Sequence, residues 1–318
     1  MKDKKTILLC GATGFIGRNL LERFGKSGDY NVRAVWHTKP ALEQYDVDWV
    51  QADLNNTHDV TRVMTGVDIV LQFAATTSGA KDIVNRPYIH VTDNAVMNSL
   101  LLREAYEQDI EHFVFPSCTV MYQPKEEATS EEDFDGSKRL YERYFGVGNT
   151  KVYIEKMCEF YAGLGKTKHT VLRHSNMYGP YDKYDLERSH VFGATITKVM
   201  TSADGCVHMW GTGEEERDLL HVNDLVEFVN EALTNQKEQY GLYNVGVGSA
   251  ISIIDLVREI ISQSGRNLEI LHDLSKPTIK TSLYLNCTKA KNEIGWEPKI
   301  SLKEGIKRTL EWYRENIL

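Results

Sequence analysis

Three glycines along one turn near the start of the chain constrain its fold more than any other feature. The segment Gly11-Ala-Thr-Gly14-Phe-Ile-Gly17 directly follows the apolar run Thr6–Cys10 and opens a stretch with helical spacing. The first glycine permits a tight turn, the second lets the backbone approach a pyrophosphate, and the third allows close packing of helix on strand. The N-terminus of the helix then offers N–H groups and a partial positive charge to phosphate. The pattern predicts a dinucleotide site at Gly11, Thr13, Gly14, Phe15, Ile16 and Gly17.

The order of the expected elements favours an α/β fold. Short β-branched runs predict strands, and stretches with apolar residues three and four apart predict the helices between them. The strands are expected at Thr6–Cys10, Asn31–Trp36, Asp48–Ala52, Asp68–Phe73 and His112–Ser117, and the helices at Ile16–Phe24, His58–Met64 and Asn94–Gln108. Alternating β and α units predict a Rossmann-type, doubly wound parallel sheet with helices on both faces.

The second half of the chain has shorter elements and more turn residues, with helices expected near Ile253–Ser262 and Leu302–Glu315. We interpret it as a smaller C-terminal α/β substrate lobe that closes over the ligand of the sheet. Residues 1–174 are expected to form the dinucleotide-binding domain, with 220–245 returning to it, and residues 175–318 to form the lobe. The acidic segment Glu126–Asp135, with six carboxylates, is expected to be a solvated loop.

Charge and composition exclude several classes of function. The chain of 318 residues has 37 basic and 45 acidic side chains, a net charge of −8, which argues against nucleic acid as a partner. No apolar run approaches the roughly 20 residues that span a bilayer, so no membrane segment is expected. The five cysteines form no CxxC pair and the ten histidines no HExxH motif. This usage favours a reducing cytoplasm and predicts no metal site.

The end of the second strand bears on the choice of dinucleotide. Sites that prefer NAD usually carry Asp or Glu there, which bonds the ribose hydroxyls. Here the strand ends in Val35-Trp36-His37-Thr38-Lys39, without an acid. His37 and Lys39, with Arg18 nearby, are suited to balance a 2′-phosphate. NADP(H) is therefore favoured, with NAD possible, and the alternative that these are only surface charges stays open.

Further motifs follow the glycine turn in a fixed order. Asp53-Leu54 closes the third strand, Ala74-Ala75 the fourth, and Asn94 lies on the next helix. Leu172-Arg-His-Ser-Asn-Met-Tyr-Gly-Pro180 comes later, then Trp210-Gly-Thr-Gly213 with Arg217-Asp218 and His221-Val-Asn-Asp224. With these motifs the sequence resembles the extended short-chain dehydrogenase/reductase family, many of whose members modify nucleotide-activated sugars. Within it, the pattern around Ser189-His190-Val191 resembles the enzymes that epimerise and reduce a GDP-4-keto-6-deoxy sugar.

The resemblance implies roles for individual residues. Those expected around the cofactor, in addition to the glycine turn, are Asp53, Leu54, Ala74, Ala75, Asn94, Lys151 and His174. Those expected around the nucleotide sugar, with GDP favoured, are Asn176, His190, Val191, Lys198, Trp210 and Arg217. His190 is expected to act as an acid in epimerisation. The resemblance also implies a homodimer formed through the helices Asn94–Gln108 and Lys151–Tyr161.

One part of the catalytic set departs from the family pattern. The family uses a Ser or Thr hydroxyl, a Tyr and a Lys four residues after that Tyr. Lys151 is in place, but the Tyr position is Val147. The hydroxyl position holds Cys118, next to Thr119, which is a candidate to replace it.

Three interpretations of this departure remain open. Another group supplies the proton, with Cys118, Tyr122, Tyr144 and His190 as candidates. Alternatively, water or the substrate serves the proton step. In the third, the chain binds cofactor and sugar nucleotide without efficient turnover and partners an active relative. A reductase of a non-nucleotide ketone or aldehyde is a further alternative, in which Arg217 would have no role.

Overall fold

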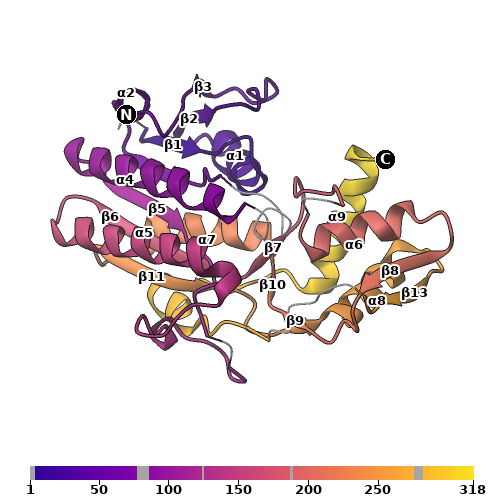
Figure 1. Ribbon diagram of the computed structural model, residues 1–318. Coiled ribbons are helices and arrows are strands. Elements are labelled where there is room, and N and C mark those ends of the chain that lie inside the picture. Colours follow the sequence, from indigo (N-terminus) through magenta and orange to yellow (C-terminus); the bar gives the residue numbers. More distant parts are fainter. Residues whose placement is uncertain (1–3, 77–85, 124, 187–188, 276–281) are drawn as a thin grey trace.

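The computed structural model describes residues 4–76, 86–123, 125–186, 189–275 and 282–318, and its centre is a parallel sheet (Figure 1). Seven strands lie in the order β11-β6-β5-β4-β1-β2-β3, and every neighbouring pair is parallel. Their bounds are β1 (Thr6–Cys10), β2 (Asn31–Trp36), β3 (Asp48–Gln51), β4 (Ile69–Gln72), β5 (His112–Pro116), β6 (Lys168–His174) and β11 (Tyr240–Val245). The predicted doubly wound α/β sheet is confirmed.

Helices cover both faces of the sheet. One face packs against α1 (Phe15–Ser27) and α7 (Val222–Asn235), the other against α2 (Thr57–Met64), α4 (Thr92–Glu107) and α5 (Phe145–Gly163). Because both faces are covered, central strands need apolar side chains on both sides. Strand β1 meets this need, since Ile7, Leu8, Leu9 and Cys10 are all fully buried.

The strand order reverses between β1 and β4, where Ile7 pairs with Ile69 and Cys10 with Gln72. In sheets of this type, ligands bind beyond the carboxyl ends of the strands at this reversal. The turn after β1 and the segment after β4 therefore border the expected ligand site.

Gly14 is the N-cap of α1, and Gly28 ends that helix with φ +73°.

A smaller region follows β6 and lies beside the carboxyl ends of the strands, on the right of Figure 1. Its helices are α6 (Val191–Thr201), α8 (Ile253–Ser264) and α9 (Leu302–Asn316). Three strand pairs accompany them: β7 (Asn176–Tyr178) with β10 (Leu219–His221), β9 (Glu216–Arg217) with β12 (Ile251–Ser252), and β8 (Cys206–Trp210) with β13 (Glu269–Asp273). Phe192, Ile196, Leu256 and Leu310 are buried in its core.

The chain crosses between the two regions more than once. After β10 it returns to the sheet, where α7 packs on α1 and β11 pairs with β6. The segment before α9 comes back as well, because Ala290, Ile294 and Trp296 are buried in the core beneath α7. The predicted domain boundaries stay a prediction.

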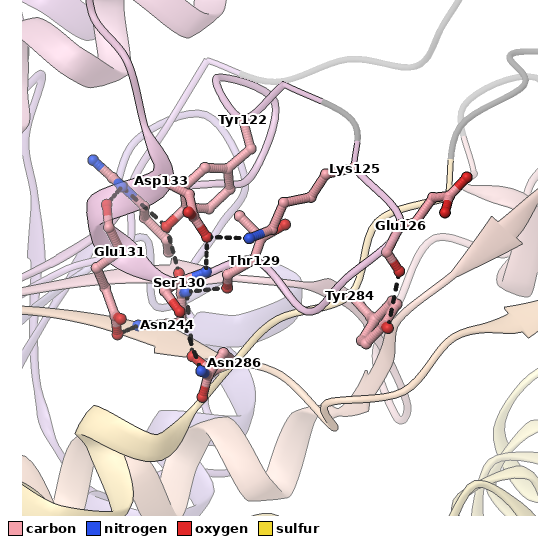
Figure 2. Close-up of polar contacts among 11 residues, drawn as sticks. Tyr122, Lys125, Glu126, Thr129, Ser130, Glu131, Asp133, Asn244, Tyr284 and Asn286 are labelled. Carbon is pink, nitrogen blue, oxygen red and sulfur yellow. Dashed lines mark hydrogen bonds and ion pairs between the residues drawn. The ribbon is translucent and has the colours of Figure 1, made fainter.

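The acidic segment differs from its expectation as a solvated loop (Figure 2). Thr129 forms a parallel bridge with Leu285, and the side chain of Asn244 donates to the Thr129 carbonyl at 2.8 Å. Glu131 is only 9% exposed and accepts the backbone N–H of Asn244 at 2.6 Å. The segment therefore packs against the end of β11. The number of acidic residues in the sequence did not reveal that one of them, Glu131, is buried.

Candidate active site

The glycine turn is held by close backbone contacts. Gly11 has φ +76°, and a Cβ there would lie 2.6 Å from the Phe73 carbonyl oxygen. A Cβ on Gly17 would lie 2.0 Å from the Gly11 carbonyl oxygen. Gly14 donates its N–H to the Gly11 carbonyl at 2.9 Å, and α1 then starts with neither a side-chain cap nor an acidic residue in its first turn. This helix terminus fits the phosphates of a dinucleotide. Ala12 is buried, and Thr13, Phe15 and Ile16 are partly exposed.

The segment after β4 is fixed beside this turn. The backbone N–H and carbonyl of Ala74 bond the side chain of Gln72 at 3.3 Å and 3.2 Å. Asn94 accepts the N–H of Thr76 at 3.0 Å and donates to the Thr76 carbonyl at 3.1 Å. Ala75 is exposed between them. Asn94 thus braces the backbone that faces the expected cofactor.

The adenosine end of the expected site carries positive side chains at its rim. His37 and Lys39 follow β2 and are exposed. The carboxylate of Asp53 accepts the N–H of Asn55 at 3.0 Å, and Leu54 is buried. The structure therefore places no carboxylate at the end of β2, the position where NAD-preferring sites hold one.

Lys151 is the residue expected at the nicotinamide end of the site. Its ammonium donates to the carbonyl of Pro116 at 2.7 Å and lies 4.6 Å from the ring centre of Phe115, which places it at the carboxyl end of β5. Burial lowers the pKa of Lys151, and the nearby Cys118 and Glu155 oppose that shift. Burial raises the pKa of the Cys118 thiol, which Lys151 partly opposes. Lysine and thiol are therefore neighbours.

Two histidines extend this group. Burial, together with the smaller effects of the charges of Lys151 and His190, lowers the pKa of His174 to about 4. The ring of His174 also pairs with the Ser175 carbonyl at 2.8 Å. His190, the N-cap residue of α6, has its pKa lowered by partial burial and by Lys183. The two regions of the molecule thus bring Lys151, His174 and His190 together.

Tyr144 and Arg217 extend the group on its other side. Burial raises the pKa of Tyr144, Arg217 opposes that shift, and Cys118 is a further electrostatic neighbour. Burial lowers the pKa of Arg217, and Glu215 and Tyr144 oppose it. Arg217 also donates to the Glu216 carbonyl at 2.6 Å. Thr119 lies partly exposed next to Cys118.

The other residues expected at the nucleotide lie on the smaller region. Lys198 donates to the His208 carbonyl at 2.8 Å and lies 5.9 Å from the ring centre of Trp210. Trp210 is 54% exposed. Asn176 is exposed and donates to the Asp218 carbonyl at 3.3 Å, and Val191 begins α6 next to His190.

Sequence reasoning missed a buried polar network behind this site. Arg173 donates two bonds to Glu155, at 3.1 Å and 2.7 Å, and both side chains are almost fully buried. Ser117 donates to the same carboxylate, which ties the loop carrying Cys118 to α5. Arg173 also donates to Tyr122 at 2.9 Å. In the sequence, the sign of this network was the spacing of Glu155. It lies four positions after Lys151, so both side chains lie on the same face of the helix.

Two negative observations apply to the described part of the chain. Its helices include none with both the length and the apolar character to cross a membrane. It also holds no group of three or more His, Cys, Asp or Glu side chains arranged to bind a metal ion.

Known proteins resemble the chain over almost its full length. GDP-L-colitose synthase of Yersinia pseudotuberculosis is 26% identical over 312 residues, 96% of this chain and 97% of that protein. GDP-L-fucose synthase of Azorhizobium caulinodans is 27% identical over 323 residues, 98% of this chain and 97% of that protein. The solved UDP-glucose 4-epimerase of Thermotoga maritima superposes with a TM-score of 0.86 at 25% identity, covering 98% and 100% of the two chains.

A family model also matches most of the chain. The model of the NAD dependent epimerase/dehydratase family covers residues 7–246, which include the glycine turn, Lys151 and Arg217. Its match agrees with the sheet order, with the site at the strand reversal and with the full-length relatives. The chain therefore belongs to the NAD dependent epimerase/dehydratase family of NAD(P)-dependent enzymes that act on nucleotide sugars.

Proposed function

We propose that the chain is an NADP(H)-dependent epimerase/reductase of a GDP-activated keto sugar, similar in reaction to GDP-L-fucose synthase. The observation that carries the proposal is the convergence of Lys151, Cys118, His174, His190 and Arg217 beside the strand reversal. These groups come from both regions of the molecule. Lys151, His190 and Arg217 stand at positions that the resemblance assigns to the family's site, whereas Cys118 departs from the family's Ser or Thr. The GDP-sugar relatives, at 26% and 27% identity, support the same reaction class.

The residues of the site fall into two sets, one for the dinucleotide and one for the sugar nucleotide. The glycine turn and α1 suit the pyrophosphate of the dinucleotide, and Lys151 is placed to bond the nicotinamide ribose. A bound nicotinamide supplies or accepts the hydride. Arg217 suits the diphosphate of the sugar nucleotide, because its planar fork donates two bonds at once. Trp210 and Lys198 are placed to hold the base.

His190 suits the epimerisation step. Removal of a proton next to a carbonyl requires a base that is neutral at working pH. Desolvation and the charge of Lys183 lower the pKa of His190, which favours the neutral imidazole that can accept that proton. If His190→Ala left epimerisation intact, this role would be excluded.

The exposed basic side chains after β2 support NADP(H) over NAD. His37 and Lys39 are exposed after β2, and no acidic residue stands at the end of that strand, which favours a 2′-phosphate there. The five cysteines of the chain are free thiols, which agrees with a cytoplasmic location. We also propose a homodimer through α4 and α5.

Turnover of defined substrates tests the proposal. The purified chain is incubated with NADPH and a GDP-4-keto-6-deoxyhexose, and with the UDP and dTDP counterparts, while cofactor oxidation and product mass are followed. We expect oxidation of NADPH with the GDP sugar and formation of a sugar two hydrogens heavier. Absence of turnover with all three sugars would overturn the proposal.

Val147 supports a second candidate, a cofactor- and sugar-nucleotide-binding protein without efficient turnover. Valine exchanges no proton, so the chain would lack the family's acid. In that case the natural chain binds the GDP sugar without oxidising NADPH, and Val147→Tyr gains activity. Failure of GDP, UDP and dTDP sugars to bind would instead favour a reductase of a non-nucleotide carbonyl.

A further inference from the structure

The turn that follows β7 contains a residue in a backbone conformation that its side chain does not favour. Asp182 donates its N–H to the Gly179 carbonyl at 3.3 Å, which closes a turn with Pro180 and Tyr181 at its centre. Tyr181 has φ +69°, a value that glycine adopts readily and a bulky side chain rarely. Such strain persists only where the surrounding contacts hold the residue, and it is often found at ligand sites. The contacts of Tyr181 therefore indicate what the strain serves.

Those contacts join the smaller region to α1, the helix of the glycine turn. The Tyr181 hydroxyl donates to the Glu22 carboxylate at 3.1 Å, and the side chain of Asn19 donates to the Pro180 carbonyl at 2.9 Å. The ring of Tyr181 also packs edge to face on Trp312 of α9, with the ring centres 5.1 Å apart. Tyr181 is thus fixed between α1 and α9.

The ring of Tyr181 carries the guanidinium of Arg18. The central carbon of that group lies 4.1 Å from the ring centre, within the range of a cation–π interaction. Within the described part of the chain, Nε of Arg18 is buried without a hydrogen-bond partner, although the residue as a whole is partly exposed. A buried N–H without an acceptor is costly, and the planar fork of an arginine matches the oxygens of a phosphate. Arg18 is therefore held in place with a donor left for a phosphate.

The direction in which Arg18 faces distinguishes between the phosphates of a dinucleotide. Glu22 and Gly25 follow Arg18 by about one and two helical turns and share its face of α1. Glu22 accepts a bond from the Tyr45 hydroxyl, and a Cβ on Gly25 would lie 3.3 Å from the side chain of Val47. Both partners belong to the connection between β2 and β3. Arg18 therefore begins the side of α1 that faces this connection.

The same connection starts at the end of β2, where sheets of this type recognise the 2′ position of the adenosine ribose. Strands β1 and β2 are parallel, so the start of α1 and the end of β2 lie at the same edge of the sheet. Arg18, His37 and Lys39 thus border one corner of that edge. The backbone N–H groups of the glycine turn suit the pyrophosphate, which leaves the guanidinium for a 2′-phosphate.

We propose that Arg18, held by Tyr181 of the smaller region, is the specificity-determining residue for NADP(H) and binds its 2′-phosphate. This inference rests on the NADP(H) preference in the proposed function. Tyr181 is a positioning residue, because its ring fixes the guanidinium before the cofactor arrives and less side-chain freedom is lost on binding. The region that binds the sugar nucleotide thereby also contributes to the choice of cofactor.

Calorimetry with two cofactors tests the role of Arg18 without turnover. Arg18→Met should raise the Kd for NADP+ about tenfold or more, because the charge-assisted bonds to the 2′-phosphate are lost. The Kd for NAD+, which has no 2′-phosphate, should stay within twofold of the natural chain. Arg23→Met is the matched control, since Arg23 lies on the same helix and pairs with Glu227 of α7 at 3.3 Å. It should leave both Kd values within twofold.

Two variants of Tyr181 test the positioning role. Tyr181→Gly relieves the strained φ and removes the ring, so the Kd for NADP+ should rise about threefold or more while that for NAD+ stays unchanged. Tyr181→Phe keeps the ring beside Arg18 and loses only the bond to Glu22, so it should bind NADP+ as the natural chain does. A purely structural role of Tyr181 would change the two Kd values alike, and that result overturns the positioning role.

The outcomes separate this inference from the proposed function. If the natural chain prefers NADP+ and Arg18→Met leaves that preference unchanged, the inference is overturned and the proposed function stands. Equal losses of NADP+ and NAD+ affinity in Arg18→Met also overturn it, because the guanidinium would then act on a group common to both cofactors. If the natural chain binds NAD+ as tightly as NADP+, the proposed cofactor preference fails and the inference with it.

Discussion

At the scale of single residues, Lys151 carries the most specific prediction about the cofactor. Its ammonium is fixed 2.7 Å from the Pro116 carbonyl, at the end of β5 and beside the expected nicotinamide ribose. Lys151→Met removes a donor that a bound ribose would share, so the Kd for NADP+ measured by calorimetry should rise about tenfold or more. Lys156→Met is the control, because Lys156 is exposed on the same helix and pairs with Glu159. Equal affinities for both variants would remove Lys151 from the cofactor site.

His169 in β6 gives a prediction about pH. The side chain is fully buried, and burial lowers its pKa to about 4. Within the described part of the chain, neither ring nitrogen has a hydrogen-bond partner. In the unfolded chain the pKa is about 6.5, so between pH 6.5 and 4 the unfolded state binds more protons. His169 therefore costs stability as pH falls through this window, about 2 kcal/mol at pH 5.

His169→Leu removes this penalty and a buried ring without partners. The gain in Tm over the natural chain should be larger at pH 5 than at pH 7.5, as measured by differential scanning calorimetry. His58→Leu, at an exposed position on α2, is the control for the substitution itself. A gain from His169→Leu that does not change with pH would contradict the argument.

Residues whose role depends on local backbone geometry could be predicted from the sequence, and those that depend on packing between distant segments could not. Gly11 and Gly17 are required by contacts within one strand–turn–helix unit, so their spacing was sufficient. Tyr144 and Cys118 are separated by 26 positions and meet Arg217 from the other region. Their proximity arises only when the smaller region folds against the sheet.

At the scale of elements, the buried ion pair between Glu155 of α5 and Arg173 of β6 fixes that helix on the sheet. Glu155→Gln leaves the guanidinium buried without its counter-charge, so the free energy of unfolding in urea should fall by about 3–5 kcal/mol. Glu159→Gln breaks only the exposed pair with Lys156 on the same helix, and should cost less than about 1 kcal/mol.

A double variant separates the pair from its surroundings. Glu155→Met with Arg173→Met should cost less than the sum of the two single variants, because no charge is then left unpaired. Some loss should remain, since Arg173 also donates to Tyr122 and to the Glu131 carbonyl. Strict additivity, or equal losses for Glu155→Gln and Glu159→Gln, would show that the pair does not couple the helix to the strand.

The strands and helices themselves followed closely from periodicity. Strands β1 and β2 have the predicted bounds. The helices predicted at Ile16–Phe24, His58–Met64 and Asn94–Gln108 differ from α1, α2 and α4 by at most three residues at either end. The acidic segment is the exception, because the burial of Glu131 depends on Asn244, 113 positions away. Periodicity describes an element's own faces, and it carries no information about a distant partner for an irregular segment.

At the scale of the whole molecule, the outer surface of α4 and α5 bears on assembly. Val96 of α4 and Tyr153 and Phe160 of α5 are apolar or aromatic side chains with 41%, 44% and 58% of their surface exposed. Ser99 and Tyr153 share a hydrogen bond at 3.0 Å, which holds the two helices together on this surface. Such a helix pair can pack against its own copy about a twofold axis, because a twofold interface brings the same surface from each subunit together.

Phe160→Glu places a charge in the middle of this proposed interface. Burying an unpaired carboxylate costs far more than exposing it, so the variant should be monomeric at low-micromolar concentration where the natural chain is dimeric. Light scattering coupled to gel filtration measures the mass directly. Leu274→Glu is the matched control, since Leu274 is 71% exposed beyond β13 on the other region, and this variant should remain dimeric. A natural chain with the mass of a monomer, or a Phe160→Glu variant that still dimerises, would place the interface elsewhere or exclude it.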